Sequence, residues 1–375
     1  MLRVAMLSVH TCPLAPLGGW ETGGMNVYVR AISHHLADLG LEIDVYTRRQ
    51  HPALPEVVEP TEGVRVIHID AGPPAPLHKE RVVGYLPEFV TQVERHAARL
   101  PGGYDLLHAH YWLSAQAGLA LKARWDVPLV VMFHTLARMK NRVLADGPER
   151  ESPRRALIEQ QAMLHADRVI AASASDRRQM LEHYLLSPAK ISVVPGGVDL
   201  GRFQQVERAA ARAALGLTAR HVLLYVGRIQ RLKGIDLLLR AAARLVREHP
   251  ALGESLVVLI VGGRPETTDS PERAELARLQ ELACRLDISQ HVHFVGAVEQ
   301  ERLPLYYAAA DATVVPSLYE SFGLVAVESM ACGTPVVAAR VGGLASTVRD
   351  GETGFLIPTR DPRLYAQRLA MLLSD

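Results

Sequence analysis

The sequence contains little cysteine, little lysine and almost no net charge. Its 375 residues include three cysteines, which are too few and too widely spaced for a disulfide framework or a cysteine-based metal cluster. The formal net charge of +1 gives no electrostatic basis for binding nucleic acid or a membrane surface. We therefore expect a cytoplasmic protein without a nucleic-acid partner. Of the five lysines, Lys79, Lys140 and Lys233 lie in the stretches that matter below.

The chain also lacks long apolar runs and the common dinucleotide fingerprints. No apolar stretch approaches the roughly 20 residues that cross a bilayer, and the first residues do not form the apolar region of a signal peptide. No G-x-G-x-x-G follows the first predicted strand, and no Walker lysine motif is present. These absences count against a membrane span, an NAD-dependent oxidoreductase and a P-loop nucleotidase.

Short apolar runs alternate with amphipathic stretches along nearly the whole chain. Val/Ile/Leu-rich strands separated by helices predict parallel sheets covered on both faces. The pattern restarts after the turn-rich stretch from Pro195 to Asp199. We predict an α/β protein with two Rossmann-like domains, residues 1–195 and 196–375, facing a central cleft. The predicted strands are residues 3–9, 42–46, 64–68, 106–110, 129–133, 168–172, 191–194, 222–227, 257–262, 291–295, 312–316, 335–338 and 354–356.

Two cations follow the first strand of the second half. Arg228 and Lys233 lie in the stretch between this strand and the next predicted helix. Ligands of parallel sheets bind at the carboxyl ends of strands. A guanidinium fork and an ammonium point charge near a helix start suit a diphosphate. Two solvated loop cations are the alternative.

Two glutamates flank a predicted helix start at residues 320–328, ESFGLVAVE. Ser321 and Gly323 precede the apolar helix positions, and free N–H groups at such a start suit an anionic ligand. The carboxylates of Glu320 and Glu328 could accept hydrogen bonds from sugar hydroxyls. The alternative is a solvated Glu320 favoured by the helix dipole and an ordinary surface Glu328.

Histidines and glycines follow strands in the first half. His108 and His110 point to one face of a strand, but the sequence offers no third ligand with suitable spacing, so we predict no metal site. His134 ends a strand and could contact a sugar in the cleft, or be a core histidine. Gly23 and Gly24 precede a helix and could receive phosphates, although a plain turn explains them as well.

Taken together, these motifs resemble those of retaining glycosyltransferases with the GT-B fold, glycosyltransferase family 4. Glu320 and Glu328 match the family's E-x7-E motif, and Arg228 and Lys233 match its donor cations. The resemblance covers essentially the whole chain. It is strongest to the D-inositol-3-phosphate glycosyltransferases of mycothiol synthesis, with sucrose-phosphate synthases further away. The shared stretches are residues 23–29, 108–114, 134–141 and 154–161.

The resemblance implies a reaction and a set of site residues. A hexosyl unit moves from a nucleotide sugar, expected to be a UDP-sugar, to a small phosphorylated polyol or sugar with retention of configuration. No metal is needed, since Arg228 and Lys233 neutralise the leaving diphosphate. Glu320 and His134 contact the donor sugar, Glu328 the ribose. The remaining donor contacts are Gly24, Ser321, Phe322, Gly323 and Leu324, and the acceptor contacts are His10, Asn26, Lys79, Tyr111, Thr135 and Arg155.

Several alternatives stay open at this level. The acceptor could be lipid-linked or a polysaccharide, or the chain could bind a nucleotide sugar without catalysis. The donor sugar and the oligomeric state, a homodimer included, are not determined. The chain ends at Asp375 within a predicted helix at residues 362–373. The resemblance implies a further helix beyond it, so we expect a shortened or unusual ending.

Overall fold

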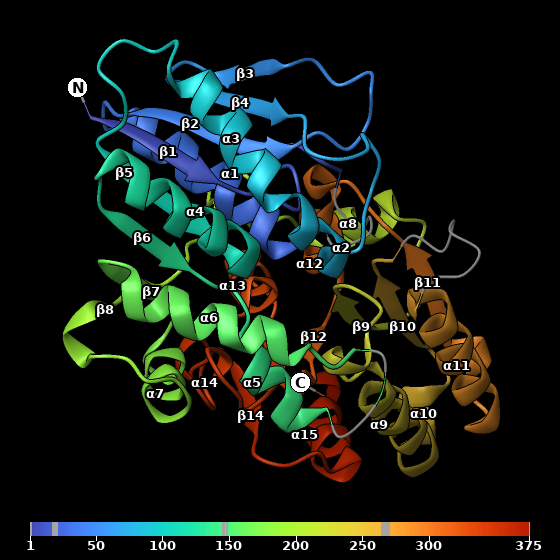
Figure 1. Ribbon diagram of the computed structural model, residues 1–375. Helices are drawn as coiled ribbons and strands as arrows, with labels where there is room; N and C mark the ends of the chain where they lie inside the picture. Colours follow the sequence, from blue (N-terminus) through green and yellow to red (C-terminus); the bar gives the residue numbers. More distant parts are fainter. Residues whose placement is uncertain (1, 17–21, 145–146, 148, 264–270, 375) are drawn as a thin grey trace. The chain divides into compact units, whose positions relative to one another are not determined.

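The computed structural model describes residues 2–16, 22–144, 147, 149–263 and 271–374 and divides the chain into two compact units. The first contains Met1–Ala15, Gly24–Asn141 and Arg150–Val194. The second contains Pro195–Asp375 together with the short segments Pro16–Gly23 and Arg142–Glu149. Each unit is an α/β structure built on its own sheet (Figure 1). The predicted fold class, two α/β domains with parallel sheets, is confirmed.

The first unit is built on a sheet with the strand order β3-β4-β2-β1-β5-β6-β7-β8. β1 pairs in parallel with β2 on one side and with β5 on the other. At one edge, β3 runs antiparallel to β4. The strands are β1 (Arg3–Leu7), β2 (Glu42–Arg48), β3 (Val57–Thr61), β4 (Val64–Ile69), β5 (Leu106–His110), β6 (Leu129–Met132), β7 (Arg168–Ala171) and β8 (Ile191–Val193).

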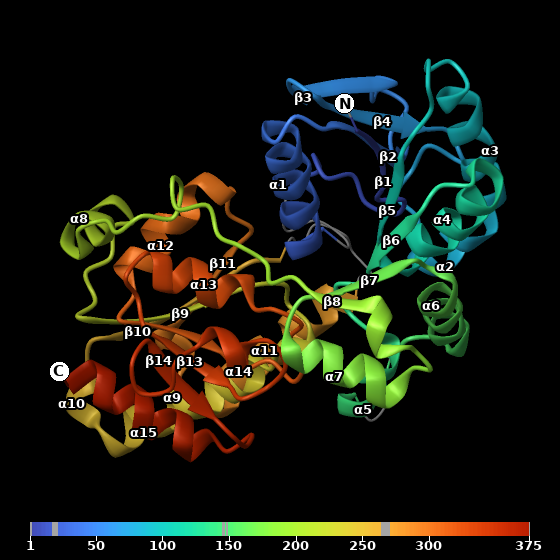
Figure 2. The ribbon, with the colours of Figure 1, turned by 90° about the vertical axis from the view of Figure 1, so that its left-hand side faces the viewer.

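Helices cover both faces of this first sheet. Figure 2 shows α1 on one side of the strands and α3 and α4 on the other. The α1 side is closed by a core in which Val29 packs against strand residues such as Val4, Val45 and Val66. The helices are α1 (Gly24–Asp38), α2 (Lys79–Val82), α3 (Leu86–Ala97), α4 (Tyr111–Trp125), α5 (Ala137–Val143), α6 (Pro153–His165) and α7 (Ala174–His183).

The second unit contains a parallel sheet with the order β11-β10-β9-β12-β13-β14. Its strands are β9 (His221–Val226), β10 (Leu256–Val261), β11 (Val292–Gly296), β12 (Ala312–Val315), β13 (Val336–Ala339) and β14 (Gly354–Ile357). Its helices are α8 (Arg208–Ala214), α9 (Ile235–Glu248), α10 (Pro250–Gly253), α11 (Pro271–Arg285), α12 (Leu303–Ala309), α13 (Leu324–Ala331), α14 (Leu344–Thr347) and α15 (Pro362–Ser374).

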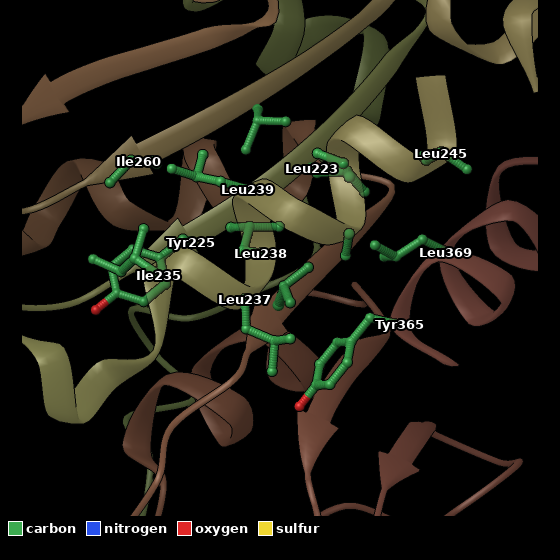
Figure 3. Packing of buried hydrophobic residues seen from close by; sticks show 14 of the residues in the cluster. Leu223, Tyr225, Ile235, Leu237, Leu238, Leu239, Leu245, Ile260, Tyr365 and Leu369 are labelled. Carbon is green, nitrogen blue, oxygen red and sulfur yellow. The ribbon is translucent and has the colours of Figure 1, made fainter. Parts of the chain in front are cut away.

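Alternate residues of β9 and β10 enter two different cores. Leu223 and Tyr225 pack with α9 and α15 residues such as Leu238 and Tyr365 (Figure 3). Their neighbour Leu224 packs in a separate core with residues of α12. Because side chains of a strand alternate between faces, an uninterrupted apolar strand buries both sides of the sheet. The cores hold the carboxyl ends of the strands in place.

Five of the described strands and helices were absent from the sequence-based prediction: β3, α2, α5, α8 and α10. The strand β3 contains Pro60, and proline inside an apolar run argues against a strand unless the strand lies at an edge. α8 has the sequence RAAARAA, which carries no apolar periodicity. α5 and α10 are short. Among the described residues, no helix is long and apolar enough to cross a membrane.

The loop after β13 presses against the backbone at Glu320, and glycine is required there. Gly342 has a φ of +50°, and a Cβ on it would lie 1.7 Å from the Glu320 carbonyl oxygen. Gly343 donates its N–H to the same oxygen at 2.9 Å. A Cβ on Gly343 would lie 2.4 Å from the Ser321 carbonyl oxygen. A larger residue at either position would displace the loop that carries Glu320.

We predict that Gly342→Ala destabilises the second unit more than the matched variant Gly351→Ala. Gly351 also has a positive φ, +85°, but no atom lies within 4 Å of its Cβ position. Both variants incur the left-handed backbone cost of roughly 1–2 kcal/mol. The clash with the Glu320 carbonyl adds about 1–3 kcal/mol for Gly342→Ala alone. Urea unfolding followed by far-ultraviolet circular dichroism measures the difference, and equal midpoints would contradict the contact.

Candidate functional site

The strand order of the second sheet reverses between β9 and β12. These two strands are neighbours in the sheet although β10 and β11 lie between them in sequence. At such a switch point the loops after adjacent strands diverge and leave room for a ligand. The loop after β9 carries Arg228 and Lys233, and the loop after β12 carries Glu320. Leu318 N–H donates to the Leu232 carbonyl at 2.9 Å, which joins the two loops directly.

An ion pair connects the charged residues of these loops. Lys233 Nζ lies 2.6 Å from Glu320 Oε2, and both side chains are about one-fifth exposed, 22% and 19%. Gly234, next to Lys233, adopts a φ of +69°, and a Cβ on it would lie 2.2 Å from the Pro316 carbonyl oxygen. Arg228 is half-buried, and its carbonyl accepts from Tyr225 Oη at 2.8 Å. The structure thus places Lys233 and Glu320 side by side and holds Arg228 in the same loop.

The helix α13 begins directly after the Glu320 loop. Gly323, in the left-handed region with a φ of +93°, precedes Leu324, the first helical residue. Ser321 is buried and Phe322 half-buried. Glu328 is buried rather than solvated: Tyr307 Oη donates to Glu328 Oε2 at 2.7 Å, and burial raises the pKa of this carboxyl group. The two glutamates therefore differ, one paired with a lysine and one with a tyrosine.

The first sheet has its own switch point between β1 and β5. The segments that follow these two strands bring the rings of His10 and Tyr111 together in a stacked arrangement, with their centroids 4.4 Å apart. Tyr111 after β5 and His134 after β6 both have positive φ, 77° and 60°. A left-handed conformation costs a residue with a side chain roughly 1–3 kcal/mol, and such residues concentrate at functional sites. Both strained residues were singled out from the sequence.

The buried His108 and His110 and the half-buried His134 lie together behind this edge. His110 Nδ1 and His134 Nε2 are 3.1 Å apart, so one donates and the other accepts. Burial lowers the pKa of His108 to about 4 and that of His134 to about 3. They are therefore neutral near pH 7. Within the described part of the chain, no group of three histidine, cysteine or acidic residues is arranged to hold a metal ion.

Arg155 is the centre of the polar network of this edge. Its side chain is fully buried, and Nη1 donates to Tyr111 Oη at 2.8 Å. Nη2 donates to the carbonyl and hydroxyl oxygens of Thr135 at 2.7 and 3.1 Å. Nε donates to Glu159 Oε1 at 2.7 Å. The neighbouring Arg154 is exposed, so the structure places Arg155 in the cluster.

Glu151 lies on the other side of the same guanidinium. Its fully buried carboxylate is 2.9 Å from Arg155 Nη1 and 2.7 Å from Lys79 Nζ, and it also accepts from Lys140. The cations hold the pKa of Glu151 well below its usual range, in spite of the burial that raises it. Four of the predicted acceptor residues, Lys79, Tyr111, Thr135 and Arg155, are thereby joined in one network.

Two further predicted residues of the first unit, Gly24 and Asn26, lie in α1. Asn26 is buried in α1 and donates to Thr11 Oγ1 and to the Cys12 carbonyl, both at 2.7 Å. It therefore holds the loop that carries His10. Gly24 is the first residue of α1.

Sequence reasoning missed the roles of Lys140, Glu151 and Glu159. Glu151, Arg155 and Glu159 are spaced four apart, and the structure pairs Arg155 with both glutamates. This i, i+4 alternation of charge was the available signal. Lys140 gave no such signal because its partner lies 11 positions away in the sequence.

Two protein-family models match the chain, one in each half. Residues 22–202 match the family described as "Glycosyltransferase Family 4". Residues 207–375 match "Glycosyl transferases group 1". Together these matches cover most of the chain, and each falls largely on one of the two units.

Individual relatives are similar over almost the whole chain. A D-inositol 3-phosphate glycosyltransferase 2 of Catenulispora acidiphila is 48% identical over 373 residues, 99% of this chain and 86% of the relative. A D-inositol 3-phosphate glycosyltransferase of Geodermatophilus obscurus is also 48% identical, over 99% of this chain and 82% of the relative. The solved sucrose-phosphate synthase from Thermosynechococcus elongatus superposes with a TM-score of 0.90 at 35% identity, covering 100% of this chain and 90% of the other. The chain belongs to the family 4 glycosyltransferases.

Proposed function

We propose that this glycosyltransferase moves a hexosyl unit from a UDP-sugar to a small phosphorylated polyol or sugar, with retention of configuration. The observation that carries the acceptor class is the network of Lys79, Tyr111, Thr135 and Arg155 at the carboxyl edge of the first sheet. Cations and hydroxyl groups that converge on one place suit a phosphate monoester. The relatives are named for inositol 3-phosphate and for sucrose phosphate, which supports the same class.

The second unit is proposed to hold the donor. Negative charge grows on the leaving diphosphate in the transition state, and Arg228 and Lys233 are the cations available to stabilise it. Glu320, fixed by Lys233, accepts hydrogen bonds from hydroxyls of the donor sugar, and Glu328 accepts them from the ribose. Backbone N–H groups assist the diphosphate, those of Gly24 and of the segment from Ser321 to Leu324.

The proposed transfer occurs on one face of the sugar. The bond between the anomeric carbon and the diphosphate oxygen breaks, and the acceptor oxygen forms its bond on the same side. The departing phosphate oxygen takes the proton of the acceptor hydroxyl, so that no protein nucleophile is required. His134 contacts the donor sugar near its 6-hydroxyl. We place the reaction in the cytoplasm, because the three free cysteines Cys12, Cys284 and Cys332 fit a reducing compartment.

We predict that the reaction needs no divalent metal, because Arg228 and Lys233 supply the positive charge that a metal would otherwise provide. UDP release in the presence of a chelator should equal the rate with added Mg²⁺. A rate that collapses with the chelator and returns with Mg²⁺ would contradict this expectation.

We predict that Arg228→Ala or Lys233→Ala lowers turnover by about 10²–10³-fold, the usual loss when one group that stabilises transition-state charge is removed. Arg240→Ala is the control, since Arg240 is exposed on α9 in the same unit. UDP release across a panel of UDP-sugars measures the effect, and circular dichroism checks folding. Wild-type turnover in either variant would show that the substituted residue does not stabilise the leaving diphosphate.

We predict that Lys79→Ala raises the KM for phosphorylated acceptors by about 10-fold or more, because a hydrogen bond to a charged group contributes about 1.5–3 kcal/mol. Arg154→Ala, on the exposed neighbour of Arg155, should leave this KM unchanged. Arg155→Ala is a poorer test, since it would leave two buried carboxylates without their guanidinium and unfold the region. The KM is measured with inositol 3-phosphate, with fructose 6-phosphate and with their unphosphorylated forms. A better reaction with the unphosphorylated forms would contradict the acceptor class.

A further inference from the structure

The buried carboxylate of Glu151 draws two ammonium groups to one place in the first unit. Lys79 Nζ lies 2.8 Å from Glu151 Oε1, and Lys140 Nζ pairs with the same oxygen. We propose that Lys140 is a second ammonium ligand of the acceptor phosphate and that Glu151 is the residue that positions both lysines. This inference rests on the proposed phosphorylated acceptor.

Exposure separates the carboxylate from the two lysines. The side chain of Glu151 has no exposed surface, whereas those of Lys79 and Lys140 are 17% and 14% exposed. A carboxylate that accepts from three buried or half-buried cations has little capacity for a substrate. An ammonium group has three N–H donors, and Glu151 does not use all of them. An incoming anion would therefore meet the lysines, and Glu151 would stay behind them.

The balance of charge in this cluster favours an added anion. Lys79, Lys140 and Arg155 carry three positive charges, against the carboxylates of Glu151 and Glu159. Like charges held this close repel one another, and in a half-buried place water screens them poorly. A phosphate group would relieve the excess positive charge that the two carboxylates leave. The phenol of Tyr111, which accepts from Arg155, faces the same cluster.

The backbone around Glu151 is fixed by the residue next to Lys140. Asn141 Nδ2 donates to the Glu151 carbonyl at 2.9 Å, and Glu151 N–H donates to Asn141 Oδ1 at 2.8 Å. The next residue, Ser152, caps α6 by accepting from Arg155 N–H at 3.2 Å. The end of α5 and the start of α6 are thus tied together. This reciprocal pair fits a preformed site, because the two lysines need no rearrangement to share one anion.

The pKa of Lys140 makes its proposed binding of the acceptor phosphate dependent on pH. Burial, together with the charges of Lys79 and Arg155, lowers this pKa to about 8, although the carboxylate of Glu151 acts to raise it. The group is therefore protonated below about pH 8 and neutral above it. Without the Glu151 carboxylate, the same surroundings would lower the pKa of Lys140 further. A phosphate monoester has a second pKa of about 6, so it is dianionic at the pH at which Lys140 loses its proton.

The first test compares Lys140→Met, Lys140→Arg and the matched control Lys122→Met. Lys122 also pairs with a carboxylate, Asp167 at 2.6 Å, but lies outside the cluster. Lys140→Met should raise the KM for inositol 3-phosphate and weaken binding of inorganic phosphate, measured calorimetrically, by about 10-fold or more. Lys140→Arg should retain most of the affinity, and Lys122→Met should match the wild type. Unchanged binding in Lys140→Met would overturn the inference.

The second test concerns the pH dependence and Glu151. In the wild type, the acceptor KM should rise above about pH 8 as Lys140 loses its proton. Lys140→Arg should abolish this rise, because a guanidinium stays charged. Glu151→Gln should raise the KM and move the rise to lower pH. If Glu151→Gln instead tightened phosphate binding, the carboxylate would be a competitor of the substrate, and the positioning role would be wrong.

The proposed acceptor class and the proposed role of Lys140 can be tested separately. If the wild type showed no preference for inositol 3-phosphate over inositol, the proposed acceptor class would fail. If that preference held and Lys140→Met kept it in full, only the role of Lys140 would fail. If Glu151→Gln does not fold, the variants Lys140→Met and Lys140→Arg still test the role of Lys140, because Lys140→Met leaves Glu151 with two cations.

Discussion

A guanidinium group without exposed surface is stable only where carboxylates and other hydrogen-bond acceptors surround it. Arg155 is such a group, and the residues around it at one edge of the first unit must supply these acceptors. Its bonds reach α4 through Tyr111, the loop after β6 through Thr135, and its own helix through Glu159. Breaking a buried pair of this kind costs about 3–5 kcal/mol, because a charge is left uncompensated. The arrangement that suits a phosphate is therefore also the one that holds these three segments in position.

The two units build their sites in different ways. In the first unit, side-chain charges set the geometry, with Glu151 and Glu159 on either side of Arg155. In the second unit, backbone contacts at Gly234 and Gly342 set it, and the pair of Lys233 and Glu320 is added to a frame of tightly packed main chain. Substitution of a half-buried charge such as Lys79 should consequently alter the first site with the fold intact, whereas loss of the buried Arg155 would unfold the region. The second site tolerates little change in its loops.

The fold was largely predictable from the sequence because apolar runs mark the strands of parallel sheets. β5 was predicted with the bounds that the structure shows, and the other parallel strands within a few residues. The edge strand β3 was missed, since burial on both faces is what makes a strand visible in sequence and β3 is mostly exposed. The helix α8 was missed for a related reason: its alanines show no apolar stripe.

The candidate site was predictable only where residues belong to contiguous motifs or follow strands. Lys233 and Glu320 could be placed near each other because both follow strands, but their direct pairing required the structure. Lys140 and the pairing of Glu151 with lysines escaped prediction because no local pattern indicates that a buried carboxylate will bind cations from three segments. Long-range charge pairing depends on packing that a single sequence does not display.

The left-handed conformations of Tyr111 and His134 have a consequence for the evolution of this enzyme. Glycine or asparagine would occupy such backbone positions at lower cost, so replacing either residue offers a direct gain in stability. The side chains that would be lost are the ones that stack on His10 and pair with His110. Selection for stability alone would therefore remove them. Their persistence would reflect a demand on activity, and libraries screened only for thermostability should lose function first at these two positions.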